Sequence, residues 1–192
     1  MQRIILASAS PRRRELMTQI GLPFEVQVSE IDESLVEGTD PAGCVCELAR
    51  KKAMAIAGQA GDGIVIGADT IVVAGGRILG KPVDADDAVE MLKLLSAMEH
   101  LVLTGVALID AATRQTLVRH ETTKVVFKRL TAQEINGYIA SGEPFDKAGA
   151  YGIQGLGAVL VREIHGCYFN VVGLPVAMLA DMLRTFGVEV LK

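Results

Sequence analysis

The apolar run from residue 64 to residue 73 constrains the fold more than any other segment of the chain. It is rich in isoleucine and valine, carries one charged residue, Asp69, and is followed by Gly75 and Gly76. A continuous β-branched run of this kind predicts a buried strand, and the paired glycines predict the turn that ends it. Because buried strands of this type occur in sheets that helices cover, the run favours the α/β class.

The remaining segments alternate between strand and helix patterns. Ser10 is the expected N-cap of the first helix, and Thr131 with Glu134 forms an expected capping box. The alternation, with hairpins among the strands, predicts a mixed, twisted sheet with flanking helices, and residues 143–157 are expected to form a glycine-punctuated loop. The other expected strands are residues 4–7, 24–29, 101–109, 116–127, 158–164 and 168–172, and the expected helices are residues 11–20, 41–57, 86–98, 131–141 and 175–186.

Length and charge exclude several classes of protein. A chain of 192 residues suits one domain, or two small lobes around a cleft. The net charge of −4 excludes a general attraction to a nucleic-acid polymer or a membrane surface, so any anion site must be local. No stretch approaches the ~18 apolar residues of a membrane span, and the N-terminal apolar run is too short for a signal peptide. Three cysteines without zinc-ligand spacing predict inert, reduced thiols in a cytoplasmic protein.

Familiar catalytic motifs are absent from the sequence. There is no Walker A motif, no zinc-binding His-Glu-x-x-His and no Gly-x-Ser-x-Gly elbow. His100, His120 and His165 have no evident cysteine or serine partner, so we assign them no catalytic role.

Three consecutive arginines, Arg12 to Arg14, follow Ser10 and Pro11 at the start of the first expected helix. A helix N-terminus carries partial positive charge and unpaired N–H groups, so arginines there are unfavourable unless an anion binds. Phosphate oxygens would meet those N–H groups, the hydroxyls of Ser8 and Ser10, and the guanidinium groups. The alternative is a solvated basic face with a carboxylate partner. The combination of residues favours an anion site.

Asp69 is the second departure from local rules, because an ionised carboxylate inside an apolar strand is costly unless it meets a cation, a metal or several donors. Gly67 and Ala68 beside it leave room for another backbone or a ligand. A structural aspartate that caps a turn at the end of the strand is the alternative. We favour a functional carboxylate that serves as a metal ligand or as a general base.

Isolated cations stand near glycine or proline elsewhere in the chain. They are Lys81, Lys147 and a third group at residues 50–52. Taken singly, each of these positions is typical of an ordinary lysine on the protein surface. Together, however, their charges are suited to surround a polyanion. The acidic segment at residues 30–40 includes Glu33 and offers hard oxygen ligands that Mg²⁺ shares with substrate phosphates, and a solvated acidic loop is its equal alternative.

Five segments of the chain, taken in order, resemble the Maf family of nucleotide pyrophosphatases. The likeness runs over nearly the whole chain, and five matches at domain-wide spacing are specific where one alone would be weak. The segments are residues 6–16, 67–72, 80–82, 146–155 and 170–175.

This resemblance implies a single domain over residues 1–192 that hydrolyses nucleoside triphosphates to the monophosphate and pyrophosphate. A divalent cation, Mg²⁺ or Mn²⁺, is the implied cofactor. The implied fold has two lobes around a nucleotide cleft and is similar to that of inosine triphosphate pyrophosphatases. The family also implies a cytoplasmic enzyme, and a homodimer is common among its members.

The resemblance extends to the branch of the family that acts on dTTP and UTP. Arg12, Thr70 and Gln154 match that branch, whereas the branch acting on 7-methyl-GTP tends to carry Trp, Gln and Glu at these positions. A neutral glutamine amide both donates and accepts, which suits the O4 and N3–H edge of uracil or thymine. A glutamate would suit a cationic methylated guanine better.

With that resemblance, each candidate residue takes a role as a hypothesis. Water attacks the α-phosphorus with Asp69 as the proton acceptor, while Asp69 also touches the metal and Glu33 supplies a second carboxylate near it. Lys147 positions the loop that carries Gln154. The residues expected to hold the triphosphate are Ser8, Arg13, Lys52 and Lys81, and those expected to set base choice are Arg12, Thr70 and Gln154.

Two alternatives accompany this reading. One is a housekeeping pyrophosphatase that removes non-standard or modified pyrimidine nucleotides such as 5-methyl-UTP, pseudo-UTP or 5-methyl-CTP. The other is a nucleotide-sensing regulator of cell division without significant turnover, since the family has a history linked to septum formation. A sensor needs the arginine cluster but no desolvated aspartate, so Asp69 argues against it.

Overall fold

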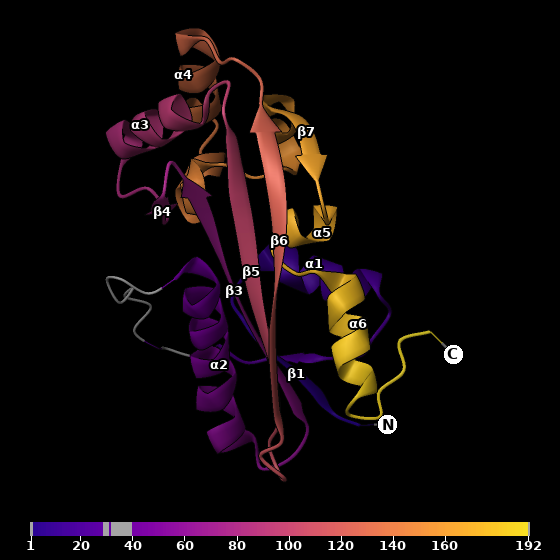
Figure 1. Cartoon of the computed structure of the whole chain (residues 1–192). Coiled ribbons are helices and arrows are strands. Elements are labelled where there is room, and N and C mark those ends of the chain that lie inside the picture. The colour runs from indigo at the N-terminus through magenta and orange to yellow at the C-terminus, as the bar shows by residue number, and fades with distance from the viewer. Residues whose placement is uncertain (1, 29–30, 32–39, 192) are drawn as a thin grey trace. The chain divides into compact units, whose positions relative to one another are not determined.

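The computed structural model describes residues 2–28, 31 and 40–191. Within these residues the strands form a mixed, seven-stranded sheet in the order β2-β1-β3-β5-β6-β7, and β4 pairs with β3 off this path (Figure 1). β1 pairs in parallel with β2 and β3, whereas β3–β4 and β6–β7 are antiparallel. The predicted mixed sheet of the α/β class is therefore confirmed. The strands are β1 (Ile4–Ala7), β2 (Glu25–Val26), β3 (Ile64–Ala74), β4 (Arg77–Leu79), β5 (Glu99–Asp110), β6 (Thr116–Phe127) and β7 (Val161–His165).

The chain divides into two compact units. Unit 1 comprises Met1–Asp69, Thr104–Glu121 and Gly173–Lys192, and unit 2 comprises Thr70–Leu103 and Thr122–Val172. Strands β3, β5 and β6 contribute residues to both units. No helix in the described part of the chain combines the length and the apolar character needed to cross a membrane.

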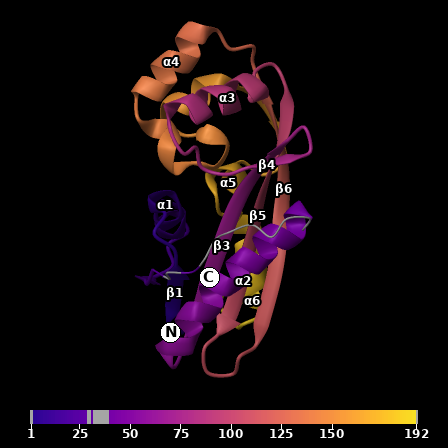
Figure 2. The same cartoon turned by 90° about the vertical axis from the view of Figure 1, so that its left-hand side faces the viewer.

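Unit 1 contains the helices α1 (Pro11–Gln19), α2 (Pro41–Ala60) and α6 (Val176–Arg184). α2 covers one face of its strands and α6 the opposite face (Figure 1), and α2 lies across β3 (Figure 2). Local signals explain the helix starts, since Ser10 caps α1 ahead of Pro11 as predicted, and Asp40 caps α2. The buried core beneath α2 consists of Ile5, Ala7, Ala49, Ala53, Ile56, Ala57, Val65, Ala107, Ile109 and Ala111.

Small residues let α2 approach the sheet closely. A Cβ atom added at Gly67 of β3 would overlap the carbonyl oxygen of Ala49, and one added at Gly105 of β5 would overlap that of Val45. The room that the sequence predicted beside Asp69 is thus filled by the backbone of another element, which is one of the two possibilities given there. This close approach sets how far a side chain of α2 must reach to meet β3.

Unit 2 contains α3 (Ala85–Leu95), α4 (Ala132–Ala140) and α5 (Tyr168–Val172), with short 3₁₀ helices between α4 and β7. α3 and α4 pack against each other (Figures 1 and 2) and bury a core with Leu92, Phe127 and Ile135. The predicted capping box is confirmed at the start of α4. The 3₁₀ helices are η1 (Glu143–Asp146), η2 (Ala148–Ala150) and η3 (Gly155–Leu160).

The prediction of a strand at residues 168–172 is wrong, because this segment forms the helix α5. Its aromatic and β-branched composition favours a strand, but the buried side chain of Asn170 donates to Val102 O over 3.0 Å and to Thr123 Oγ1 over 2.9 Å. These contacts with distant residues stabilise a helical turn too short to show a helical periodicity in sequence. Two other strands are shorter than expected: β2 spans Glu25–Val26, and β7 starts at Val161 because η3 occupies the preceding residues.

Candidate functional site

The candidate residues fall into two groups, one in each unit. The group in unit 1 is Ser8, Arg12, Arg13, Lys52 and Asp69, and the group in unit 2 is Thr70, Lys81, Lys147 and Gln154. Glu33, the expected second carboxylate near the metal, lies outside the described residues, as does most of the acidic segment around it.

Lys52 of α2 and Asp69 of β3 form a buried ion pair at the centre of the first group. The Lys52 Nζ donates to Asp69 Oδ1 over 2.7 Å, and the two side chains are only 10% and 11% exposed. Of the three kinds of partner expected for Asp69, which were a cation, a metal or several donors, the structure shows a cation. A charge pair this buried stabilises a fold weakly at best, because both groups lose hydration, and a functional use is one reason to retain it.

Arg13 links α1 to the strand that carries Asp69. Its Nε donates to Gly173 O over 2.8 Å, and its Nη1 donates to Ala68 O over 2.9 Å and to Ser8 Oγ over 3.3 Å. The side chain is buried, so these bonds hold the carbonyl group directly before Asp69. Sequence reasoning assigned Arg13 to phosphate alone and missed this bracing, whose partners are 55 and 160 residues away.

The turn between β1 and α1 presents the hydroxyl of Ser8. Its Oγ accepts from Ser10 N over 3.2 Å as well as from Arg13, and the side chain is buried. Ser10 in turn accepts from Arg13 N over 3.5 Å as the N-cap of α1. Arg12 lies half-buried in the first turn of this helix, where the first-turn residues include no acidic side chain. The structure therefore has the features on which the predicted anion site depends: the N-terminus of α1, the serine hydroxyls and the arginines of its first turn.

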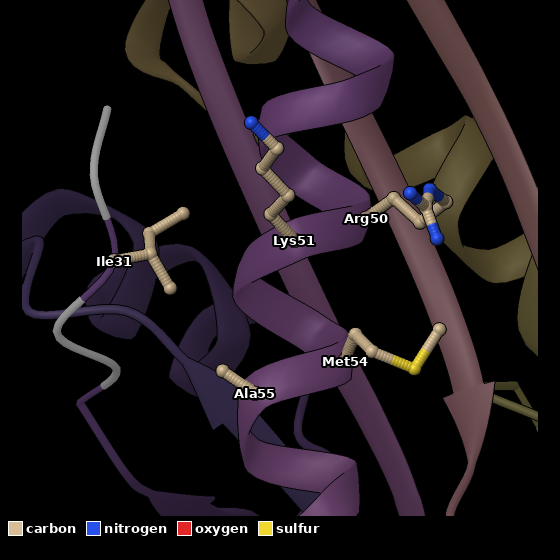
Figure 3. Close-up of a pocket in the computed structure, with 5 residues that line it drawn as sticks. All are labelled: Ile31, Arg50, Lys51, Met54 and Ala55. Atoms are coloured by element: carbon tan, nitrogen blue, oxygen red, sulfur yellow. The ribbon is translucent and has the colours of Figure 1, made fainter. Parts of the chain in front are cut away.

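The basic group at residues 50–52 does not act as one cluster. Consecutive residues of a helix point about 100° apart. Lys52 turns inward to Asp69, whereas Arg50 pairs with Glu47 over 2.8 Å. Lys51 is exposed and lines an open cavity of about 400 Å³ on the outer side of α2 (Figure 3). The other residues that line this cavity are Ile31, Arg50, Met54 and Ala55.

The second group gathers around the loop that follows α4. Gly149 N donates to Gly80 O over 2.9 Å, which joins this loop to the turn that carries the exposed Lys81. Gly149 has a φ of +69°, and a Cβ atom there would lie 2.9 Å from a Val72 methyl group, so only glycine fits. Thr70 follows Asp69 directly on β3 and is half-buried.

Lys147 and Gln154 belong to the same loop but differ in how they are held. The Lys147 Nζ donates to Glu143 O over 2.5 Å and to Asp146 Oδ1 over 2.6 Å, so its ammonium is engaged within the loop. Gln154 is half-buried at the N-cap position of η3, and its side chain makes no capping hydrogen bond. These contacts support the hypothesis that Lys147 positions the loop and that Gln154 presents its amide to a ligand.

A buried aromatic cluster underlies this loop. The rings of His100, Phe127 and Tyr151 pack edge to face with centroids 4.7–5.3 Å apart, and His100 Nε2 lies 2.7 Å from the Tyr151 hydroxyl. Burial lowers the pKa of His100 to about 4 and raises the pKa of Tyr151, so both side chains are neutral at pH 7. The absence of a sequence motif around His100 concealed this structural role.

The thiols show no reactive environment. Cys44, Cys46 and Cys167 form no disulfide, and burial raises the pKa values of Cys44 and Cys46. Both therefore remain protonated near neutral pH, which agrees with the inert thiols predicted from the sequence.

The donor chemistry near Asp69 fits a divalent metal that is shared with a substrate. Among the residues that the structure describes, no three His, Cys, Asp or Glu side chains come together as a metal cluster. Mg²⁺ is commonly bound by one or two carboxylates together with substrate phosphates and water. Among the described residues, the single carboxylate of Asp69 is therefore enough to bind such an ion together with a substrate. A complete protein cage, as calcium or structural zinc would need, is not formed by these residues.

Comparisons with known proteins match the chain over nearly its whole length. The family described as "Maf-like protein" matches residues 3–186. A protein of Desulforamulus reducens named dTTP/UTP pyrophosphatase is 54% identical over 190 residues, which cover 99% of this chain and 100% of that protein. Proteins of the same name from Pelotomaculum thermopropionicum and Bacillus cereus are 52% and 51% identical, and the matches cover at least 98% of each chain.

A weaker likeness links the chain to a solved structure. That structure is a HAM1 protein from Coxiella burnetii, with 21% identity and a TM-score of 0.48, and the match covers 68% of this chain and 75% of that one. At that score the overlap adds nothing to the assignment.

Proposed function

Because the chain belongs to the Maf-like protein family, we propose that it is a nucleoside triphosphate pyrophosphatase that converts dTTP and UTP to the monophosphate and pyrophosphate. The full-length match to relatives that carry the name dTTP/UTP pyrophosphatase, at 51–54% identity, carries this proposal. The buried Asp69 supports it independently, since a pure binding module has no use for a desolvated carboxylate.

Asp69 is the proposed general base. Its carboxylate accepts a proton from the water molecule that attacks the α-phosphorus, and pyrophosphate leaves on the opposite side. Lys52 holds Oδ1 at 2.7 Å and compensates the charge of the carboxylate, while Arg13 holds the preceding carbonyl group. Both contacts limit the motion of Asp69, and a fixed orientation is what a general base needs.

A divalent metal, Mg²⁺ or Mn²⁺, is the proposed cofactor, with Asp69 and Glu33 as its protein ligands. When bound, such an ion neutralises charge on the triphosphate oxygens and orients them. Ser8, Lys52 and Lys81 are proposed to hold the triphosphate, and Arg13 contributes from the first turn of α1.

Base choice is proposed to rest on Arg12, Thr70 and Gln154. The amide of Gln154 pairs with the O4 and N3–H edge of a pyrimidine, an edge that modified pyrimidines such as 5-methyl-UTP share. The proposed role in the cell is removal of non-standard or modified pyrimidine nucleotides, in the cytoplasm and as a homodimer.

The test is pyrophosphate release from a panel of nucleotides with Mg²⁺ or Mn²⁺, with 7-methyl-GTP in the same series. We expect the largest kcat/KM for dTTP and UTP, and loss of turnover when a chelator removes the metal. A preference for 7-methyl-GTP would keep the reaction and overturn the assigned base choice. Nucleotide binding without any turnover would contradict the enzyme and favour a nucleotide sensor.

A further inference from the structure

We infer that Glu143 is a positioning residue for base recognition, which holds Lys147 and Gln154 in one fixed arrangement. The inference rests on the proposed function, because it concerns how the enzyme selects its pyrimidine substrate. Sequence reasoning gave Glu143 no role, and it stands at the start of η1, four residues before Lys147 and eleven before Gln154.

The carboxylate of Glu143 caps the helix that Gln154 opens. Its Oε1 accepts from Leu156 N over 3.0 Å, and its Oε2 accepts from Gly157 N over 3.3 Å. These N–H groups at the start of η3 are the ones that a side chain at the N-cap position ordinarily satisfies. Since Glu143 satisfies them from outside the helix, the side chain of Gln154 is not needed for capping and is available to a ligand.

The backbone of Glu143 holds Lys147, the residue proposed to position the loop. Its carbonyl oxygen accepts from Lys147 Nζ over 2.5 Å. The stem of Lys147 then passes so close to Gly152 that a Cβ atom there would lie 2.8 Å from the lysine Cε. Glu143 is therefore bonded on both sides of the segment that carries Gln154, to Lys147 through its carbonyl group and to Leu156 and Gly157 through its carboxylate.

Tyr138 of α4 joins this arrangement from a second direction. Its hydroxyl accepts from Gly152 N over 3.2 Å, and it is also hydrogen-bonded to the Glu143 side chain. Burial and the neighbouring Glu143 carboxylate raise the pKa of Tyr138 to about 12, so the hydroxyl stays protonated and donates to Glu143. The carboxylate is thus oriented by a rigid helix of the same unit.

Gly155 leaves the space that the Glu143 carboxylate occupies. Its φ is +65°, and a Cβ atom on it would lie 2.7 Å from Glu143 Oε1. The loop is therefore built around the carboxylate. Removal of the carboxylate would release the N-terminus of η3 and widen the range of positions that Gln154 samples, while the Asp69 group in unit 1 keeps its own contacts.

The test compares Glu143→Ala and Glu143→Gln with the wild-type enzyme, using dTTP, UTP and 7-methyl-GTP as substrates. Loss of two charge-assisted hydrogen bonds should raise KM for dTTP about ten-fold in Glu143→Ala, with kcat changed less than about three-fold. The ratio of kcat/KM for dTTP over 7-methyl-GTP should fall at the same time. Glu143→Gln keeps one acceptor oxygen and should lie between Glu143→Ala and the wild type, and it carries the test if the alanine variant fails to fold.

The matched control is the same pair of substitutions at Glu134. Glu134 also caps a helix of unit 2, since its Oε2 accepts from Thr131 N over 2.8 Å, but it has no place in the proposed site. Its variants should lower Tm and leave KM unchanged. An unchanged KM and selectivity in both Glu143 variants, with a similar fall in Tm, would overturn the positioning role. A wild-type enzyme inactive on dTTP and UTP would overturn the proposed function instead, so the two failures are distinguishable.

Discussion

Lys52 and Asp69 meet at 2.7 Å because Gly67, two residues before the aspartate, lets the backbone of α2 approach β3. The ammonium of a lysine near the middle of a helix reaches a strand carboxylate only when the two elements pack closely. The glycine and the ion pair are therefore parts of one arrangement, and a change at the glycine should disturb the carboxylate without touching it.

Gly67→Ala tests this dependence. The added methyl group would overlap Ala49 O, and we expect the free energy of unfolding to fall by about 2–3 kcal/mol, as overpacking of a core typically causes. Turnover should fall as well, because Lys52 and Asp69 move apart. Urea unfolding and pyrophosphate release measure the two effects. Gly58→Ala is the control: Gly58 lies on α2, and a Cβ atom added there would meet no other part of the protein within 4 Å, so its replacement should be neutral or slightly stabilising. Equal behaviour of the two variants would contradict the close-packing argument.

Asp69→Asn tests the general base. The amide keeps the shape of the carboxylate but accepts no proton, and kcat should fall at least about 100-fold. Circular dichroism should show an unchanged fold. Unchanged turnover would refute the assignment of Asp69 as the base.

The stability of this variant gives a second readout. Asp69→Asn leaves the Lys52 ammonium buried without a carboxylate, so the variant should be less stable by up to about 3 kcal/mol. Adding Lys52→Met removes the unpaired charge, and the double variant should recover part of that loss, as measured by chemical unfolding. Equal stability of the single and double variants would show that the unpaired Lys52 ammonium is not what destabilises Asp69→Asn.

The features that the sequence predicted correctly depend on residues close together in the chain. Ser10 with Pro11, and Thr131 with Glu134, are local signals, and the structure has both caps where they were expected. The buried strand around Asp69 was equally clear, because its apolar, β-branched run extends over many residues. Such patterns need no knowledge of the fold.

The features that sequence reasoning missed depend on distant contacts. The helix α5 forms where a strand was expected, and the partners of Asn170 are 68 and 47 residues away. A cation was one of the partners expected for Asp69, but the sequence did not identify it as Lys52, which was assigned to the triphosphate instead. Glu143 has no motif of its own, since a glutamate beside a glycine-rich loop is ordinary until the backbone of that loop folds around it.

The burial of His100 should make the free energy of unfolding fall at acidic pH. Its pKa in the folded protein is lowered from 6.5 to about 4 by burial, so unfolding allows proton uptake between those values. The stability that the neutral imidazole contributes is complete above pH 6.5 and is lost as the pH falls towards 4, by about 3 kcal/mol over that range. Urea unfolding between pH 7 and pH 4.5 should show this slope. His100→Phe should make the free energy of unfolding depend less on pH, whereas the same change at the exposed His165 should leave this pH dependence as in the wild type. An unchanged slope in His100→Phe would refute His100 as its cause.

Gln154→Glu tests base choice at the position where Glu143 has taken over helix capping. A glutamate there lacks the N–H donor that pairs with O4 of uracil or thymine, and we expect kcat/KM for dTTP and UTP to fall about ten-fold or more. Activity on 7-methyl-GTP should rise, since the carboxylate favours the positive charge of the methylated base. Initial rates on the three nucleotides measure the shift. Gln133→Glu, an exposed change on α4 of the same unit, should alter none of the three rates. If both variants keep the wild-type preference, Gln154 does not contact the base.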